Sequence, residues 1–273
     1  PTGRVRDPLR PGIDYDAGRP VNGSETRMLR EIHCTEVWGG AGGCDVSVKL
    51  AGVRGEVFSR VYEDGESGGD IHFLSVCGMS ILSKVVLADV SGHGAESAEV
   101  SAVIHDALVE SIGAHDNSSM LSYVNDAFLK RRTGSFKFTT MVSMIVDSRD
   151  RSLVYAYAGH PAILLGSRKT GRFLPIRPED GVQGNLPLGV LSGHEIRFEQ
   201  HAAQLEAGDV LVVYTDAFTE ARTTGGELLG EKGLTRLLEG APSLDPADLK
   251  AHVLKTLGSR FDDDASLLVL EVL

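Results

Sequence analysis

The pattern of apolar and polar positions predicts a chain made mainly of short β-strands. Residues 53–63 carry valine and phenylalanine at strand-like intervals, and the run between Lys84 and Asp89 is continuously apolar, which is typical of a buried strand. The polar turn at residues 147–150 joins two later runs into a hairpin. Together, the runs predict strands at residues 53–63, 71–77, 84–89, 138–146, 153–158, 162–165, 195–201, 210–214 and 265–272.

Two segments show the apolar spacing of helices. After Gly94, apolar residues recur three and four positions apart up to about residue 111, and residues 120–128 repeat the pattern. Asp245 followed by Pro246 gives a favoured cap and first position for a later helix. Two helices come together between groups of strands, so the order lacks the strict alternation of a parallel sheet. We therefore expect packed antiparallel sheets with helices on the outside.

The composition is that of a globular protein with a short polar arm. The chain has 273 residues, of which 42% are hydrophobic, and this is enough for a full core. Residues 1–27 are rich in proline, glycine, arginine and aspartate and show no apolar period, so we expect an extended or disordered arm there. Residues 28–273 are expected to form a single domain.

The charge balance limits the class of partner. A formal net charge of −11 disfavours nucleic acids and anionic membrane surfaces, and the longest basic run is residues 130–132. No apolar stretch reaches the length of a membrane helix, and no signal peptide opens the chain. The three cysteines, Cys34, Cys44 and Cys77, have no Cys-x-x-Cys spacing for zinc or redox work, so we expect them to be reduced thiols. These features predict a cytoplasmic protein that binds neither nucleic acid nor membrane.

Four acidic segments lie where an apolar run meets a turn, at residues 68–70, 87–94, 214–216 and 262–264. Asp at a strand end is often a turn or cap residue, so each position has a purely local alternative. Asp70 follows two glycines and Asp89 precedes Ser-Gly-His-Gly, which lets the backbone approach a ligand closely. Converging carboxylates repel one another unless a hard divalent cation neutralises them. The four segments therefore predict a metal-binding carboxylate cluster.

These segments also carry a resemblance to a known family. Together with two others, and in the same order, they resemble the signature segments of bacterial PPM (PP2C-like) serine/threonine phosphatases. The branch is the one that includes stress-response and sporulation phosphatases of partner-switching pathways. The similarity spans about residues 55–273, and its segments are Ser67-Gly68-Gly69-Asp70, Ala88-Asp89-Val90-Ser91-Gly92-His93-Gly94, Ala158-Gly159-His160-Pro161, Leu186-Pro187-Leu188-Gly189, Tyr214-Thr215-Asp216-Ala217-Phe218-Thr219-Glu220-Ala221 and Asp263-Asp264-Ala265-Ser266.

The resemblance implies an α+β fold, an αββα four-layer sandwich of two antiparallel β-sheets flanked by helices. It also implies two divalent metal ions, Mn²⁺ or Mg²⁺, at one edge of the sheets. Carried over position by position, the side-chain ligands are Asp70, Asp89, Asp216 and Asp263, helped by the Val90 carbonyl, and these aspartates are catalytic through metal-bound water. The two predicted helices, residues 95–132, resemble the family's switch region; simple covering of the sheet is the alternative.

Several positions depart from the family pattern or invite a second interpretation. Asp264 is expected to face solvent or cap the last strand, because Asp263 stands two positions before the small residue that opens it. Ala217 replaces a usual glycine, so we expect a slight perturbation of the backbone without loss of a ligand. The glycine-rich residues 38–43 lack a nucleotide-loop ending and are interpreted as a flexible turn. His93 is not assigned as a general acid, and His160 is either structural or a substrate contact.

The resemblance implies a metal-dependent protein phosphatase that hydrolyses phosphoserine or phosphothreonine by a two-metal activated water. Its expected substrate is a phosphorylated anti-anti-sigma-type protein, with a regulatory protein or a second copy of the chain as a further partner. The chain lacks Walker, His-Glu-x-x-His and Cys-x₅-Arg motifs. Two alternatives stay open, a catalytically silent binding module of the same fold and a metallohydrolase that acts on a small phosphate ester.

Overall fold

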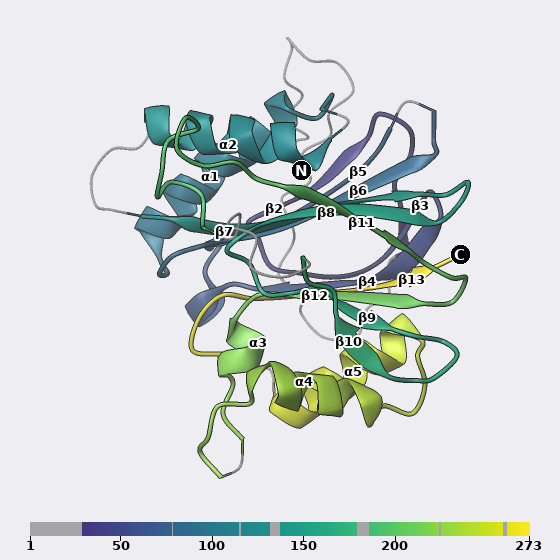
Figure 1. The fold of residues 1–273 in the computed structure, drawn as a ribbon. Coiled ribbons are helices and arrows are strands. Elements are labelled where there is room, and N and C mark those ends of the chain that lie inside the picture. Colours follow the sequence, from purple (N-terminus) through teal and green to yellow (C-terminus); the bar gives the residue numbers. More distant parts are fainter. Residues whose placement is uncertain are drawn as a thin grey trace, which may run out of the picture.

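Two β-sheets lie face to face in the middle of the molecule, and helices cover the outer face of each (Figure 1). The computed structural model describes residues 29–77, 79–114, 116–131, 137–178, 186–223, 225–258 and 261–273. The predicted arm, residues 1–27, lies outside the described residues. The predicted αββα sandwich is confirmed by this arrangement.

One sheet has seven strands in the order β1-β3-β4-β13-β12-β9-β10. Every neighbouring pair is antiparallel except β1 with β3, which is parallel. The strands are β1 (Leu29–Glu31), β3 (Cys44–Leu50), β4 (Val53–Arg60), β13 (Ala265–Val272), β12 (Val210–Tyr214), β9 (Leu164–Gly166) and β10 (Phe173–Pro175). The predicted strands at residues 210–214 and 265–272 agree with β12 and β13 residue for residue.

The second sheet has six strands, all antiparallel, in the order β11-β8-β7-β6-β5-β2. The strands are β11 (Gln200–Gln204), β8 (Ser152–Ala158), β7 (Thr139–Asp147), β6 (Leu82–Val90), β5 (Asp70–Val76) and β2 (Val37–Gly40). The predicted hairpin is confirmed, because β7 and β8 pair directly across residues 148–151. The strand β6 is central in this sheet and carries Asp89 near its end.

Three apolar layers hold the sandwich together. Successive residues of a strand point to opposite faces, so Leu74 of β5 packs between the sheets while Phe73 packs under the helices. The helices α1 and α2 cover the six-stranded sheet, and α4 and α5 cover the seven-stranded sheet (Figure 1). No described helix is long and apolar enough to cross a membrane. The helices are α1 (Ala95–Glu110), α2 (Asn117–Arg131), α3 (Ala217–Glu220), α4 (Gly230–Glu239), α5 (Pro246–Leu257) and the 3-10 turn η1 (Tyr62–Asp64).

Two predictions of local structure were wrong. Residues 38–40, expected in a flexible turn, belong to β2 and pair with β5; a Cβ on Gly39 would lie 2.0 Å from the His72 carbonyl oxygen, so glycine allows this close pairing. Residues 195–199, expected in a strand, precede β11 instead. Phe198 there is fully buried, and its carbonyl accepts a hydrogen bond from Ser118 of α2. Packing against that helix replaces pairing with a strand.

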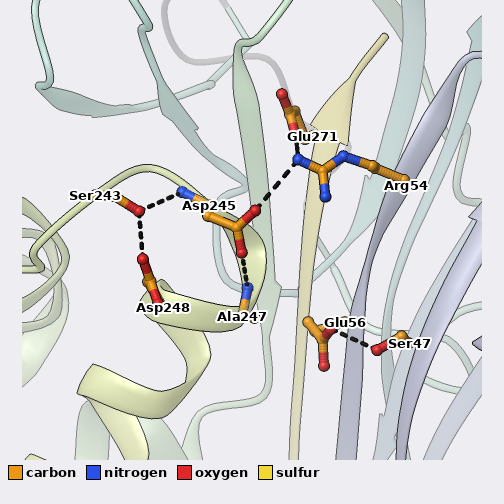
Figure 2. Close-up of polar contacts among 8 residues, drawn as sticks. All are labelled: Ser47, Arg54, Glu56, Ser243, Asp245, Ala247, Asp248 and Glu271. Atoms are coloured by element: carbon orange, nitrogen blue, oxygen red, sulfur yellow. Dashed lines mark hydrogen bonds and ion pairs between the residues drawn. The ribbon is translucent and has the colours of Figure 1, made fainter. Parts of the chain in front are cut away.

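Charged contacts fix α5 to the seven-stranded sheet. Asp245 caps the helix by accepting a hydrogen bond from the Ala247 N–H at 2.9 Å, as its sequence predicted. Arg54 of β4 pairs with both Asp245 and Glu271 (Figure 2). Together, these contacts tie the start of α5 to two neighbouring strands of the sheet.

A buried ammonium group strengthens the same junction. Lys250 of α5 is only 2% exposed, and its Nζ pairs with Glu56 at 2.6 Å and with Asp45. Glu56 is also buried and accepts a hydrogen bond from the Ser47 hydroxyl at 2.6 Å (Figure 2). A buried carboxylate of this kind is tolerated only while its cation is present.

Replacing Lys250 with Met keeps the length of the side chain and removes its charge. We expect the free energy of unfolding to fall by about 3 kcal/mol, because Glu56 is left buried without its cation. Urea denaturation followed by circular dichroism measures the change. Lys169→Met is the matched control, since Lys169 and its partner Glu206 are exposed and water screens a surface pair of this kind. Equal effects of the two substitutions would contradict this role for Lys250.

Candidate metal centre

Two of the predicted ligands stand opposite each other on neighbouring strands. Asp70 is the first residue of β5, and Asp89 is its cross-strand partner near the end of β6. Side chains of directly opposed residues lie on the same face of the sheet, so the two carboxylates are close. Asp70 is 2% exposed. The register of this pair therefore places the Asp89 carboxyl group beside the buried carboxyl group of Asp70.

The pKa values show that the predicted carboxylates share one electrostatic environment. Burial raises the pKa of Asp70 well above its usual range, and the neighbouring Asp89 raises it further. Burial, followed by the charges of Asp216 and Asp263, raises the pKa of Asp89 to about 8. Asp216 is exposed as a residue, but partial desolvation of its carboxyl group, followed by the charges of Glu220 and Asp263, also raises its pKa. The structure thus brings the carboxylates of both sheets within electrostatic range of one another.

A threonine hydroxyl joins the two sheets at this centre. Thr215, at the end of β12, donates a hydrogen bond to Asp70 Oδ2 at 3.0 Å and accepts one from the Ser266 N–H at 3.0 Å. Asp70 Oδ1 is buried and has no hydrogen-bond partner among the described residues. A buried carboxylate oxygen without a partner is costly, and a cation at that position would satisfy it. No sequence pattern marks Thr215 beyond its place beside Asp216.

Asp264 has a structural role that was not predicted from the sequence. The expectation that it faces solvent or caps the last strand is wrong: Asp264 is 5% exposed and accepts hydrogen bonds from the Tyr62 N–H at 2.7 Å and the Gly69 N–H at 2.5 Å. A Cβ on Gly68 would lie 2.4 Å from Asp264 Oδ1, so the contact requires glycine. Asp264 thus fixes the turn that leads into Asp70.

Asp263 and Asp216 approach the centre from its outer side. Asp263 is partly exposed, and its Oδ1 accepts a hydrogen bond from the Asp264 N–H at 2.8 Å. Asp216 is exposed and immediately precedes α3, with a backbone of φ −61° and ψ −21°. Ala217 is the first residue of that helix, where any L-residue fits. The backbone at Ala217 is helical and does not require the family's usual glycine. The slight perturbation of the backbone that we expected from Ala217 is therefore not needed to fit an alanine there.

The Val90 carbonyl lies beside the same turn. The Val90 N–H donates to the Gly69 carbonyl at 3.2 Å. A Cβ on Gly69 would lie 2.9 Å from the Val90 oxygen and 3.3 Å from the Gly92 oxygen, so both carbonyls lie close to this glycine. The backbone oxygens that follow Asp89 are therefore gathered where the turn before Asp70 passes.

The two histidines of the signature segments have different surroundings. The His93 ring is exposed and packs on Tyr62, with ring centroids 4.5 Å apart. His160 is 4% exposed, and burial lowers its pKa to about 4. Its Nδ1 lies 3.2 Å from the Pro161 carbonyl oxygen. His160 is thus a neutral, buried histidine at neutral pH, which favours the structural interpretation.

The donor set fits a hard divalent cation. Among the described residues, no three His, Cys, Asp or Glu side chains are already gathered in the geometry of a formed metal site. The chemistry nevertheless matches, because the donors are carboxylate and carbonyl oxygens, the pKa values of the carboxylates are raised, and Asp70 Oδ1 lacks a partner.

A family model matches most of this chain. The model of Stage II sporulation protein E (SpoIIE) covers residues 83–273, which include Asp89, Asp216 and Asp263. Phosphoserine phosphatase RsbU of Bacillus subtilis (strain 168) is 28% identical over 194 residues, which are 68% of this chain and 54% of RsbU. The chain thus spans about half the length of RsbU. RsbU is named a phosphoserine phosphatase.

Solved structures with low identity show the fold. The PP2C phosphatase domain of SpoIIE from Bacillus subtilis matches with a TM-score of 0.66 at 19% identity, over 87% of this chain and 71% of that chain. RsbX in complex with magnesium matches with a TM-score of 0.63 at 20% identity, over 84% of this chain and 100% of that chain. The predicted resemblance is thereby confirmed: this chain has the PP2C fold and belongs to the SpoIIE family.

Proposed function

We propose that this chain is a divalent-metal-dependent phosphatase that hydrolyses phosphoserine or phosphothreonine in a protein. The observation that carries the proposal is the centre in which carboxylates of both sheets raise one another's pKa while Asp70 Oδ1 is buried without a partner. Two Mn²⁺ or Mg²⁺ ions would be held by Asp70, Asp89, the Val90 carbonyl, Asp216 and Asp263. In support, RsbU is named a phosphoserine phosphatase, and the RsbX structure contains magnesium.

The chain supplies the frame for this chemistry. Divalent cations, when bound, would neutralise the phosphoryl oxygens and lower the pKa of water, which phosphate ester hydrolysis needs. Thr215 fixes the orientation of the Asp70 carboxylate, and the register of β5 with β6 sets Asp89 beside it. His93 packs on Tyr62 and His160 is buried, so neither is assigned to proton transfer. The departing serine oxygen would take its proton from water.

The exposure of the outer carboxylates favours a protein substrate over a small phosphate ester. Asp216 is exposed and Asp263 is partly exposed, so a phosphorylated side chain on a protein surface could reach the centre without entering a deep pocket. We propose a phosphorylated regulator of the anti-anti-sigma type in the cytoplasm as the substrate. A silent binding module is less favoured, because it would have no use for buried carboxylates that repel one another.

Asp89→Asn and Asp216→Asn should each lower Mn²⁺-dependent phosphate release from a phosphoserine protein by more than about 100-fold. Loss of a direct ligand should exceed the roughly 10–100-fold cost of losing an outer partner of a metal site. The assay measures inorganic phosphate with and without Mn²⁺, and circular dichroism checks the fold. Asp106→Asn, on the exposed side of α1, is the matched control and should keep full activity. Unchanged turnover in both site variants would refute the proposed metal centre.

In the metal-free chain, Asp89 should lower the free energy of unfolding as the pH rises from about 6.5 to about 7.5. The folded-state pKa of Asp89 is about 8, above its value of 3.8 in the unfolded chain, so unfolding releases a proton in this window and becomes easier as the pH rises; the raised pKa of Asp70 acts in the same direction. We expect the contribution of Asp89 to be about 1 kcal/mol, since one pKa unit corresponds to 1.36 kcal/mol.

Other groups titrate near this pH window and act in the opposite direction. Burial lowers the pKa of His72 and His160 to about 4 and that of Lys84 to about 8, so unfolding takes up protons on these groups. The Asp89 contribution is therefore the difference in slope between the unaltered chain and Asp89→Asn, which urea denaturation at several pH values measures. Saturating Mn²⁺ should also remove that contribution, and Asp106→Asn should leave the slope unchanged. A slope that is the same in Asp89→Asn as in the unaltered chain would contradict the assignment.

A further inference from the structure

Helix α1 turns two buried serines toward the loops of the candidate metal centre. Ser97 and Ser101 lie one helical turn apart, and both are fully buried. The Ser101 hydroxyl lies 2.7 Å from the Gly68 carbonyl oxygen and 3.1 Å from that of Gly69. The Ser97 hydroxyl lies 2.7 Å from the Gly92 carbonyl oxygen. One face of α1 therefore contacts both loops.

The contacted loops carry the proposed ligands. Gly68 and Gly69 lead directly into Asp70, and Gly92 follows the pair Asp89 and Val90. The Asp70 carboxylate is attached to the backbone by one short side chain, and the Val90 carbonyl is part of the backbone itself. The positions of both ligands therefore depend on the backbone of these loops. Hydrogen bonds that fix the loops consequently fix the ligands.

The Gly68-Gly69 turn is held from two opposite sides. Asp264 accepts a hydrogen bond from the Gly69 N–H, while Ser101 donates to the carbonyl oxygens of the same turn. A serine hydroxyl has a single proton, and the Ser97 carbonyl of the same helix competes for it at 2.9 Å. The Gly68 oxygen is the nearer acceptor. Removing the hydroxyl would leave a loop carbonyl without this donor.

The second loop is held by a similar network. Lys137, just before β7, donates from Nζ to the Ser91 carbonyl at 2.9 Å and to the Ser97 hydroxyl at 3.4 Å. Ser97 can accept from Lys137 and at the same time donate to Gly92. The Lys137 side chain is 16% exposed, so this network is largely shielded from water. It connects α1 and β7 to the end of β6.

We propose that Ser97 and Ser101 are positioning residues of the metal centre, which hold the two loops so that Asp70 and the Val90 carbonyl face the cations. This inference rests on the proposed function. Ser111 of the same helix region shows what a merely structural serine does. It is also buried, but among the described residues its hydroxyl donates only to the α1 carbonyls of Ala107 and Leu108.

The test compares Ser97→Ala, Ser101→Ala and the control Ser111→Ala in the full chain. Equilibrium dialysis without substrate gives the Mn²⁺ dissociation constant, and urea denaturation of the metal-free proteins gives their stability. We expect Mn²⁺ binding to weaken about tenfold in Ser97→Ala and Ser101→Ala, the size typical of losing an outer partner of a metal site. Ser111→Ala should bind Mn²⁺ as the unaltered chain does. If Ser101→Ala fails to fold, Ser97→Ala decides alone.

A second measurement separates positioning from general damage. Phosphate release is followed against Mn²⁺ concentration, and the serine variants should need about tenfold more Mn²⁺ for half-maximal rate while reaching nearly the same rate at saturation. Unchanged dissociation constants, equal weakening in Ser111→Ala, or no Mn²⁺ binding by the unaltered chain would each overturn the inference. Weakened Mn²⁺ binding in a chain that releases no phosphate would instead leave the inference standing and count against the proposed phosphatase activity.

Discussion

Repulsion between carboxylates is the constraint that shapes the candidate metal centre, and the fold must hold the centre together against it. Asp70 and Asp89 face each other across β5 and β6, where like charges destabilise a sheet. Two hydrogen bonds oppose their separation. Asp264 accepts one from Gly69 in the turn before Asp70, and Thr215 of the other sheet donates one to the Asp70 carboxylate. Because the surrounding strands are packed on both faces, the charges cannot relax by moving apart. Protons or cations are the remaining ways to relieve them.

The two sheets contribute unequal halves to the centre. The six-stranded sheet supplies Asp70 and Asp89 from within regular strands, whereas Asp216 and Asp263 lie just outside β12 and β13 in the seven-stranded sheet. In the first half, Asp70 is buried and the pair is fixed by register, while in the second half Asp216 is exposed. This division suits a site that must keep its geometry on one side and admit a bulky partner on the other.

Much of the fold could be predicted because its signals are local. The strands β12 and β13 are continuous apolar runs bounded by turns, and they were predicted with their observed bounds. The strand β2 was missed because Gly39 reads as a turn residue, while its pairing depends on the distant backbone of His72. Asp264 was misjudged for the same reason. Its partners Tyr62 and Gly69 are 202 and 195 positions away, and no local pattern reveals such contacts.

The hydrogen bonds of Asp264 to Tyr62 and Gly69 have a consequence for the order of folding. The strand β13 lies in the middle of its sheet, between β4 and β12, although it follows both in the sequence. During synthesis, the turn before Asp70 leaves the ribosome long before Asp264 does. The turn before Asp70 therefore lacks its hydrogen bond to Asp264 until β13 inserts between β4 and β12. Insertion of a central strand closes contacts of high sequence separation, which is a slow step in folding. Assembly of the centre and completion of the sheet are thus one and the same event.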